Sequence, residues 1–200
     1  MSYTMSVDRV IQLSRCDDFP EATIRQMFAA HKATELPLPV LATLEIPLSV
    51  KVFLALQDEF FSPEEFRELA VQFAKRAAAH DTAVAGNHFV TSALAAYDQL
   101  LTQSRAKAVQ GVLAKAAMQV SGYRAAVKAM IQPDANGGVK PALQAVAAYE
   151  AVWFAGYETN GIACRNAASC AVAAVPKPQA DAELQWVLKE AVDKTLARAA

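Results

Sequence analysis

The sequence predicts an all-α fold, a compact bundle or array of about seven to eight helices around an alanine-rich core. Alanine supplies 43 of the 200 residues, and it is the best helix former because it loses no side-chain entropy in a helix. Glycine is scarce, with 7 residues. Apolar residues also recur at helical spacing along most of the chain. Together these three observations favour packed helices over strands.

Alanine is unevenly distributed, which divides the chain into two parts. Residues 1–60 hold 6 of the 43 alanines, and residues 61–200 hold 37. The first part is richer in Pro, Leu and Phe, and its prolines stand among Leu and Val rather than in a polar linker. We therefore expect a single all-α domain over residues 1–200, in which the N-terminal part (1–60) packs on the alanine-rich helical part (61–200).

Two helices are expected in the N-terminal part. Ser6 is placed to cap a short helix in "SVDRVIQL". Asp18 and Glu21 have the spacing of a capping box, which predicts a second helix over about residues 20–31. The apolar face of this second helix would consist of Ile24, Met27 and Phe28.

The clearest helix signal lies in residues 63–79. Ser62 is the expected N-cap, Pro63 takes the first helical position and Glu65 completes a capping box. Phe61 and Phe66 have the spacing of a hydrophobic staple. The predicted buried face is Phe66, Leu69, Ala70, Phe73 and Ala77.

Further helices are expected after "VAGN" (84–87), which ends this one. The next has Val90, Leu94, Tyr97 and Leu101 on its face, and helical spacing continues over residues 105–131, before a loop at 132–138. The last helix is expected over 181–198. Its predicted buried residues are Leu184, Val187, Leu188, Ala191, Val192 and Thr195, and its predicted outer residues are Glu183, Lys189, Glu190, Asp193 and Lys194.

Residues 139–158 form a helix that is apolar nearly all round, which is typical of the centre of a fold. Its large side chains, expected on one side, are Leu143, Val146, Trp153, Phe154 and Tyr157. Glu150 falls in the middle of that side. It is either a buried carboxylate or a partner of Arg124, Lys128 or Arg165 in a salt bridge.

Composition disfavours several classes of protein. With 19 basic and 20 acidic residues the net charge is −1, so the basic excess of a nucleic-acid-binding protein is missing. No apolar run approaches the roughly 18 residues of a membrane span, and the start of the chain does not resemble a secretory signal. Three cysteines, an odd number, favour a reducing cytoplasmic location. We expect no cofactor.

The spacing of Cys164 and Cys170 in "GIACRNAASC" indicates packing rather than chemistry. Six helical residues place the two side chains about 120° apart around the axis and about 9 Å apart along it. A disulfide needs Cα atoms within about 7 Å, and one metal ion could not readily reach both sulfurs. Both cysteines also lie off the polar stripe of Arg165, Asn166 and Ser169. We expect them to behave as small hydrophobic residues.

One set of residues has the pattern of a metal site. His31, His80, Asp81 and Asp134 are similar in order to the H…HD…D skeleton of the HD-type metal-dependent phosphohydrolases, in which such residues hold metal ions that activate water. The simpler interpretation is that His31 and His80 end helices and that Asp134 lies in a turn. The metal-dependent phosphohydrolase is therefore kept as an alternative function.

The candidate binding residues are Trp186, Lys189, Arg105, Lys115 and Arg124. Trp186 would point about 160° away from the apolar face of the last helix, so it is either covered by the N-terminal segment or offered to a partner. The three others between residues 105 and 124 belong to a mildly basic stretch, which is also consistent with a solvated helix face.

Two segments resemble alanine-rich helical proteins of bacteria and phages of the immunity-protein type. They are "KVFLALQDEFFSPEEFRELAVQFAKRAA" (51–78) and "AELQWVLKEAVDKTL" (182–196). This resemblance implies a non-enzymatic protein that binds and blocks a protein partner, such as a toxin. A phage-encoded inhibitor of a host defence complex is an alternative, and a structural homodimer is a third class.

Overall fold

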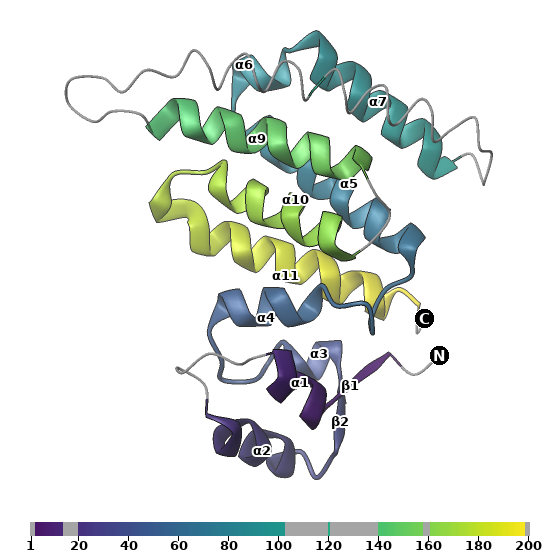
Figure 1. Ribbon diagram of the computed structural model, residues 1–200, viewed down its shortest axis with the longest axis vertical. Helices are drawn as coiled ribbons and strands as arrows, with labels where there is room; N and C mark the ends of the chain where they lie inside the picture. The colour runs from purple at the N-terminus through teal and green to yellow at the C-terminus, as the bar shows by residue number, and fades with distance from the viewer. Residues whose placement is uncertain (1–2, 14–19, 103–119, 121–139, 158–160, 199–200) are drawn as a thin grey trace. The chain divides into compact units, whose positions relative to one another are not determined.

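The structure is a computed structural model that describes residues 3–13, 20–102, 120, 140–157 and 161–198 (Figure 1). Over these ranges the chain forms ten α-helices, eight of them with seven residues or more, and two three-residue strands. The predicted all-α fold is therefore confirmed. The helical stretch expected over 105–131 and the loop at 132–138 lie outside the described residues, Val120 excepted.

The chain divides into two compact units. The first unit consists of Met1–Ser62 together with Leu184–Ala200, and the second unit consists of Pro63–Glu183. The division after Ser62 falls where the alanine content rises, whereas the last helix belongs mainly to the first unit. The single domain over residues 1–200 stays a prediction.

The first unit combines short helices with a small antiparallel sheet. Its helices are α1 (Val7–Leu13), α2 (Glu21–Ala30), α3 (Leu38–Leu41), α4 (Leu48–Ala55) and, from Leu184 onward, α11 (Ala180–Leu196). Strands β1 (Thr4–Ser6) and β2 (Glu35–Pro37) pair with Met5 opposite Leu36, and both of these side chains are buried. Sequence patterns do not predict these strands, because three residues are too few to show an alternating pattern.

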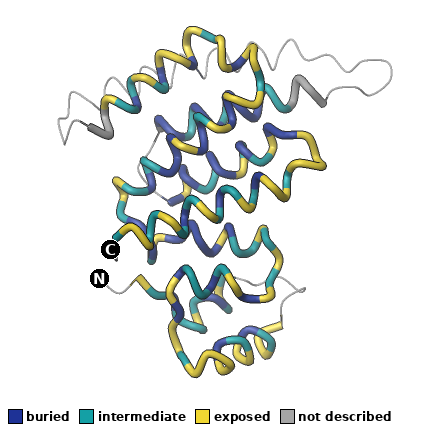
Figure 2. The backbone as a smooth tube through the Cα atoms, turned by 180° about the vertical axis from the view of Figure 1, so that it is seen from behind, coloured by how far each residue is buried: buried dark blue, intermediate teal, exposed yellow. Residues whose placement is uncertain are grey.

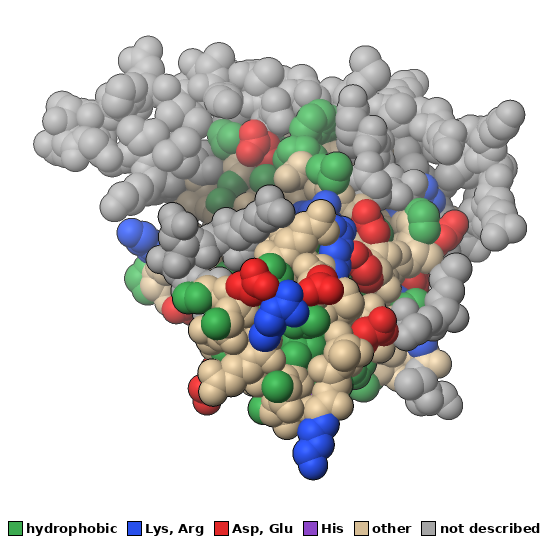
Figure 3. All heavy atoms as spheres, turned by 60° about the horizontal axis from the view of Figure 1, so that its bottom comes forward, with side chains coloured by type: hydrophobic (Ala, Val, Ile, Leu, Met, Phe, Trp, Pro, Cys, Tyr) green, Lys and Arg blue, Asp and Glu red, His purple; other side chains and the backbone are tan. Residues whose placement is uncertain are grey.

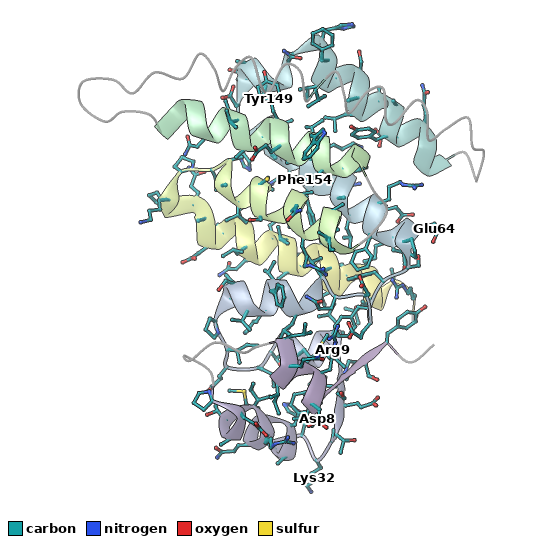
Figure 4. All side chains as sticks on the ribbon, in the orientation of Figure 1. Asp8, Arg9, Lys32, Glu64, Tyr149 and Phe154 are labelled. Carbon is teal, nitrogen blue, oxygen red and sulfur yellow. The ribbon has the colours of Figure 1, made fainter. Side chains whose placement is uncertain are left out.

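The cap predicted for α1 is present. The backbone N–H of Arg9 donates to Ser6 Oγ at 3.2 Å. The Arg9 side chain, labelled in Figure 4, points to Glu59, and Arg9 Nε donates to Glu59 Oε1 at 2.5 Å. This pair joins α1 to the chain segment that follows α4, 50 residues later.

The capping box predicted for α2 is wrong. The helix begins at Glu21 with Pro20 as its N-cap, so Glu21 takes the first helical position instead of the third. Glu21 instead accepts from Arg25 Nε at 2.8 Å, and Arg25 Nη2 also donates to Asp8 Oδ1 at 3.0 Å.

Arg198, the last residue that the structure describes, contacts two other segments of the first unit. Arg198 Nη1 donates to the Phe60 carbonyl oxygen at 2.8 Å. Its guanidinium carbon lies 4.3 Å from the centroid of the Tyr3 ring and 5.2 Å from that of Phe61, which are cation–π distances. Three segments of the first unit that are distant in the sequence therefore meet at one side chain.

Helix α2 ends in a Schellman motif, which leads to a stability prediction. Lys32 N donates to Ala29 O, Ala33 N donates to Phe28 O, and Lys32 has a φ of 52°. This left-handed conformation costs a residue with a Cβ about 1–2 kcal/mol. We expect Lys32→Gly to raise the free energy of unfolding by about 1 kcal/mol, measured by urea unfolding. Lys32→Ala, which keeps the Cβ, is the control, and an equal gain there would contradict the explanation.

The second unit is built on three long helices. These are α5 (Pro63–Ala79), α9 (Lys140–Tyr157) and α10 (Gly161–Ala173), each of which packs against the other two. The other elements are α6 (Thr82–Ala85), α7 (His88–Thr102), the 3-10 helix η1 (Lys177–Gln179) and the first residues of α11. Helix α7 packs against α5 and α9. The helix predicted over residues 63–79 is confirmed at both ends.

The contact surfaces of these three helices are made mainly of small residues. The buried alanines are Ala70, Ala74, Ala77 and Ala78 on α5, Ala147, Ala148, Ala151 and Ala155 on α9, and Ala163, Ala167, Ala168 and Ala171 on α10. Figure 2 shows the buried residues concentrated where these helices face one another. Short side chains let helix axes approach closely, which explains the high alanine content of the second unit.

Helix α9 turns a face of small residues, and not its large side chains, toward its neighbours. Helix α9 packs against four other helices, α5, α6, α7 and α10, and its most buried face consists of Ala148, Ala151, Val152 and Ala155. Trp153 and Phe154 are only half-buried, and their rings contact each other with centroids 4.7 Å apart. Close packing selects the small residues for the centre and leaves the large rings at the margin. The side chains of Leu143 and Tyr157 lie outside the described set.

Candidate functional site

The C-terminal helix α11 carries both candidate binding residues that the structure describes. Lys189, with 68% of its side chain exposed, pairs with Asp193 one turn later. Trp186 is half-buried. Arg105, Lys115 and Arg124 lie outside the described residues, so the structure brings none of them to this helix.

Exposed residues of α11 form one face, which we call the outer face. It consists of Gln185, Lys189, Asp193 and Leu196, with Trp186 at one edge and Val192 at the other. Leu196 is 50% exposed and lies one turn after Asp193 on this face. The hydrogen bond from Lys189 to Asp193 raises the pKa of the Lys189 ammonium. The outer face therefore combines apolar and charged side chains on one helix.

Charge is balanced elsewhere on the molecule as well. In Figure 3 acidic and basic side chains lie next to one another, with hydrophobic side chains between them, on the face that is drawn. This pattern agrees with the net charge of −1.

Glu183 corrects the sequence prediction for the last helix. We expect it on the outer side, but its side chain is only 2% exposed. Arg76 Nε on α5 lies 3.2 Å from each of its carboxylate oxygens, and His80 Nε2 lies 3.3 Å from Glu183 Oε2. We call these three residues the Glu183 clasp. A buried carboxylate needs such partners because the loss of hydration is otherwise uncompensated.

The helical spacing of α11 indicates that Glu183 lies on its buried face. Glu183, Val187 and Ala191 are four residues apart and share one face of α11, and all three are buried. The sequence pattern assigns Val187 and Ala191 to the buried face but leaves Glu183 outside because it is charged. Its partners are more than 100 residues away, and no local pattern identifies them.

The histidines and aspartates of the alternative metal site have other roles in the structure. His31 is the exposed C-cap residue of α2, in the first unit. His80 follows the end of α5 and contacts Glu183. Asp81 Oδ1 caps α6, accepting from Ala83 N at 2.8 Å and Val84 N at 3.2 Å. Asp134 lies outside the described residues, and within those residues no three His, Cys, Asp or Glu side chains are grouped to hold a metal.

The cysteines of α10 agree with the packing prediction. Cys164 is fully buried, and burial raises the pKa of its thiol well above the ordinary value. Cys170 is half-buried, and its Sγ lies 3.9 Å from Glu150 Oε2 on α9. Both are free thiols. Glu150 is itself half-buried rather than central, because α9 turns its alanine face inward.

Comparison with known proteins does not assign the chain to a family. Protein-family models, curated proteins and solved structures gave no match to the chain. Over the described ranges, no helix combines the length and the apolar character that crossing a membrane requires.

Proposed function

We propose that this chain is a non-enzymatic protein that binds and blocks a protein partner through the outer face of α11. The observation that carries the proposal is the exposure of Leu196 beside the Lys189–Asp193 ion pair, with Trp186 at the edge of the same face. Interface hot spots favour Trp, and they are surrounded by side chains that exclude water. A preformed helix also loses little conformational entropy when it docks.

The resemblance to proteins of the immunity-protein type supports an inhibitory role toward a toxin or toward a component of a defence system. The mixed charge of the outer face suits a protein surface, since a partner with both signs of charge can match it. A cytoplasmic location is part of the same proposal.

Trp186→Ala tests the proposal. The partner would first be captured with the wild-type chain from the native host and purified, and its affinity would then be measured by calorimetry. We expect Trp186→Ala to weaken binding at least tenfold, because truncating a hot-spot residue costs about 2 kcal/mol or more. The circular dichroism spectrum should not change.

Gln185→Ala, which truncates a polar residue of the same face, serves as the control and should bind within about twofold of the wild type. Unchanged affinity of Trp186→Ala would overturn the proposal. So would a purified chain that forms only a homodimer in light scattering, or one that hydrolyses phosphate esters.

A further inference from the structure

Helix α11 is the only element of the described chain that contributes to both compact units. The second unit ends at Glu183, and the first unit resumes at Leu184, within the same helix. Trp186 lies three residues after Glu183, which is less than one turn. The contacts of Glu183 with Arg76 and His80 therefore hold the helical turn that directly precedes Trp186.

We infer that the Glu183 clasp is a positioning device that keeps the first turn of α11 helical and thereby fixes the orientation of Trp186. The importance of this device for partner binding rests on the proposed function. Its stabilisation of the first turn of α11 does not. Glu183 is a positioning residue in this inference, because it acts through the helix and touches no partner.

The anchor of the clasp is rigid. Arg76 lies in the last turn of α5 and His80 directly follows the helix, four residues later, and both side chains reach one carboxylate. Helix α5 has 17 residues and packs against α9 and α10. A side chain that is fixed to α5 is therefore fixed to the centre of the second unit.

The first turn of α11 has few other buried groups. Asp181, Ala182 and Gln185 are exposed, and Ala180 is half-buried, so Glu183 is the buried side chain of residues 180–183. The first turn of a helix also frays readily, since its four N–H groups have no partner within the helix. The contacts of Glu183 with Arg76 and His80 oppose this fraying and add to the support from the 3-10 helix η1, which leads directly into α11.

Hydrogen exchange of the full-length chain, measured by NMR, tests the effect on the helix. Glu183→Gln keeps the size of the side chain but removes its charge. We expect the amides of residues 184–187, which a helix bonds to the carbonyls of residues 180–183, to exchange about tenfold faster or more. Asp181→Asn removes a negative charge from the same turn at an exposed position, and exchange there should increase by less than about fivefold, since such a charge contributes at most about 1 kcal/mol.

Tryptophan fluorescence tests the effect on Trp186. The chain has 2 tryptophans, so Trp153→Phe leaves Trp186 as the only one. In that background we expect Glu183→Gln to increase quenching of Trp186 by acrylamide. Tyr97→Phe, which weakens the second unit at a different position, should not change the quenching. This comparison separates a positioning role from general loss of stability.

A further variant keeps the inference testable if Glu183→Gln does not fold. His80→Gln changes a side chain that is 24% exposed and removes one partner of Glu183, and we expect a smaller change in exchange and quenching in the same direction. The inference is overturned by unchanged exchange in a folded Glu183→Gln chain, or by an equal increase in Asp181→Asn. Neither measurement needs a partner, so both outcomes are independent of the Trp186→Ala result.

Discussion

Replacing Gly156 by alanine is expected to lower the free energy of unfolding by about 2–3 kcal/mol. Gly156 lies on α9 where Tyr97 of α7 crosses it. A Cβ at this position would lie 2.2 Å from the Tyr97 hydroxyl oxygen and 2.6 Å from Cζ of the same ring. Both distances are far inside van der Waals contact. Tyr97 is fully buried, so its ring has no solvent-filled space into which it could move.

Three contributions decide the size of this effect. Overpacking a buried contact costs about 1–3 kcal/mol. Displacing the Tyr97 ring would also break its hydrogen bond to the Val152 carbonyl oxygen, 3.1 Å away, at about 0.5–1.5 kcal/mol. Burial raises the pKa of Tyr97, so the phenol keeps the proton that it donates. The higher helix propensity of alanine opposes these two effects, because it raises the free energy of unfolding by about 1 kcal/mol. The unfavourable contributions are the larger ones.

Urea unfolding of the variant and of two controls measures this effect. Gly86→Ala makes the same chemical change where the nearest atom, Thr82 O, is 3.2 Å from the new Cβ, and we expect a change within about 1 kcal/mol. In a Tyr97→Leu background, Gly156→Ala should lose most of its cost because the ring is gone. An equal cost in both backgrounds would contradict the steric explanation.

Local patterns predict the elements whose determinants are adjacent in the sequence. The start of α5 follows from Ser62, Pro63 and Glu65, and the cap of α1 follows from Ser6, because a helix end depends on three or four neighbouring residues. The polar stripe of α10 is predicted as well, because residues three and four apart lie on the same face of a helix. Arg165, Asn166 and Ser169 are half-buried or exposed there, while Cys164 is buried.

Features that depend on distant contacts are not predictable in this way. The burial of Glu183 depends on Arg76 and His80, and the orientation of α9 depends on how closely α5 and α10 approach it. In a helix that is apolar all round, periodicity does not distinguish the face that packs from the face that remains at the margin. The candidate surface is predicted in part: Trp186 and Lys189 are identified from helical spacing, whereas the exposure of Leu196 is not.

Phe73→Ala is expected to have the largest effect on stability, a loss of about 4 kcal/mol in the free energy of unfolding. Phe73 is a fully buried residue of α5, the helix that packs against both α9 and α10. Truncation of a buried phenylalanine costs about 3–5 kcal/mol, and the value depends on how far the neighbouring groups can close the cavity. Here the facing surfaces consist mainly of alanine, whose methyl group has no rotamer through which it could fill the space.

The matched control for this substitution is Phe53→Ala on α4, where the phenylalanine is 42% exposed. The same atoms are removed, but about half of the ring area is already in contact with water, so we expect a loss of about 1 kcal/mol or less. Urea unfolding followed by circular dichroism gives both values. A Phe73→Ala loss below about 2 kcal/mol would mean that the helices of the second unit move together and close the cavity. In that case the small-residue surfaces would be adaptable rather than rigid, and the high alanine content would not fix the positions of α5, α9 and α10.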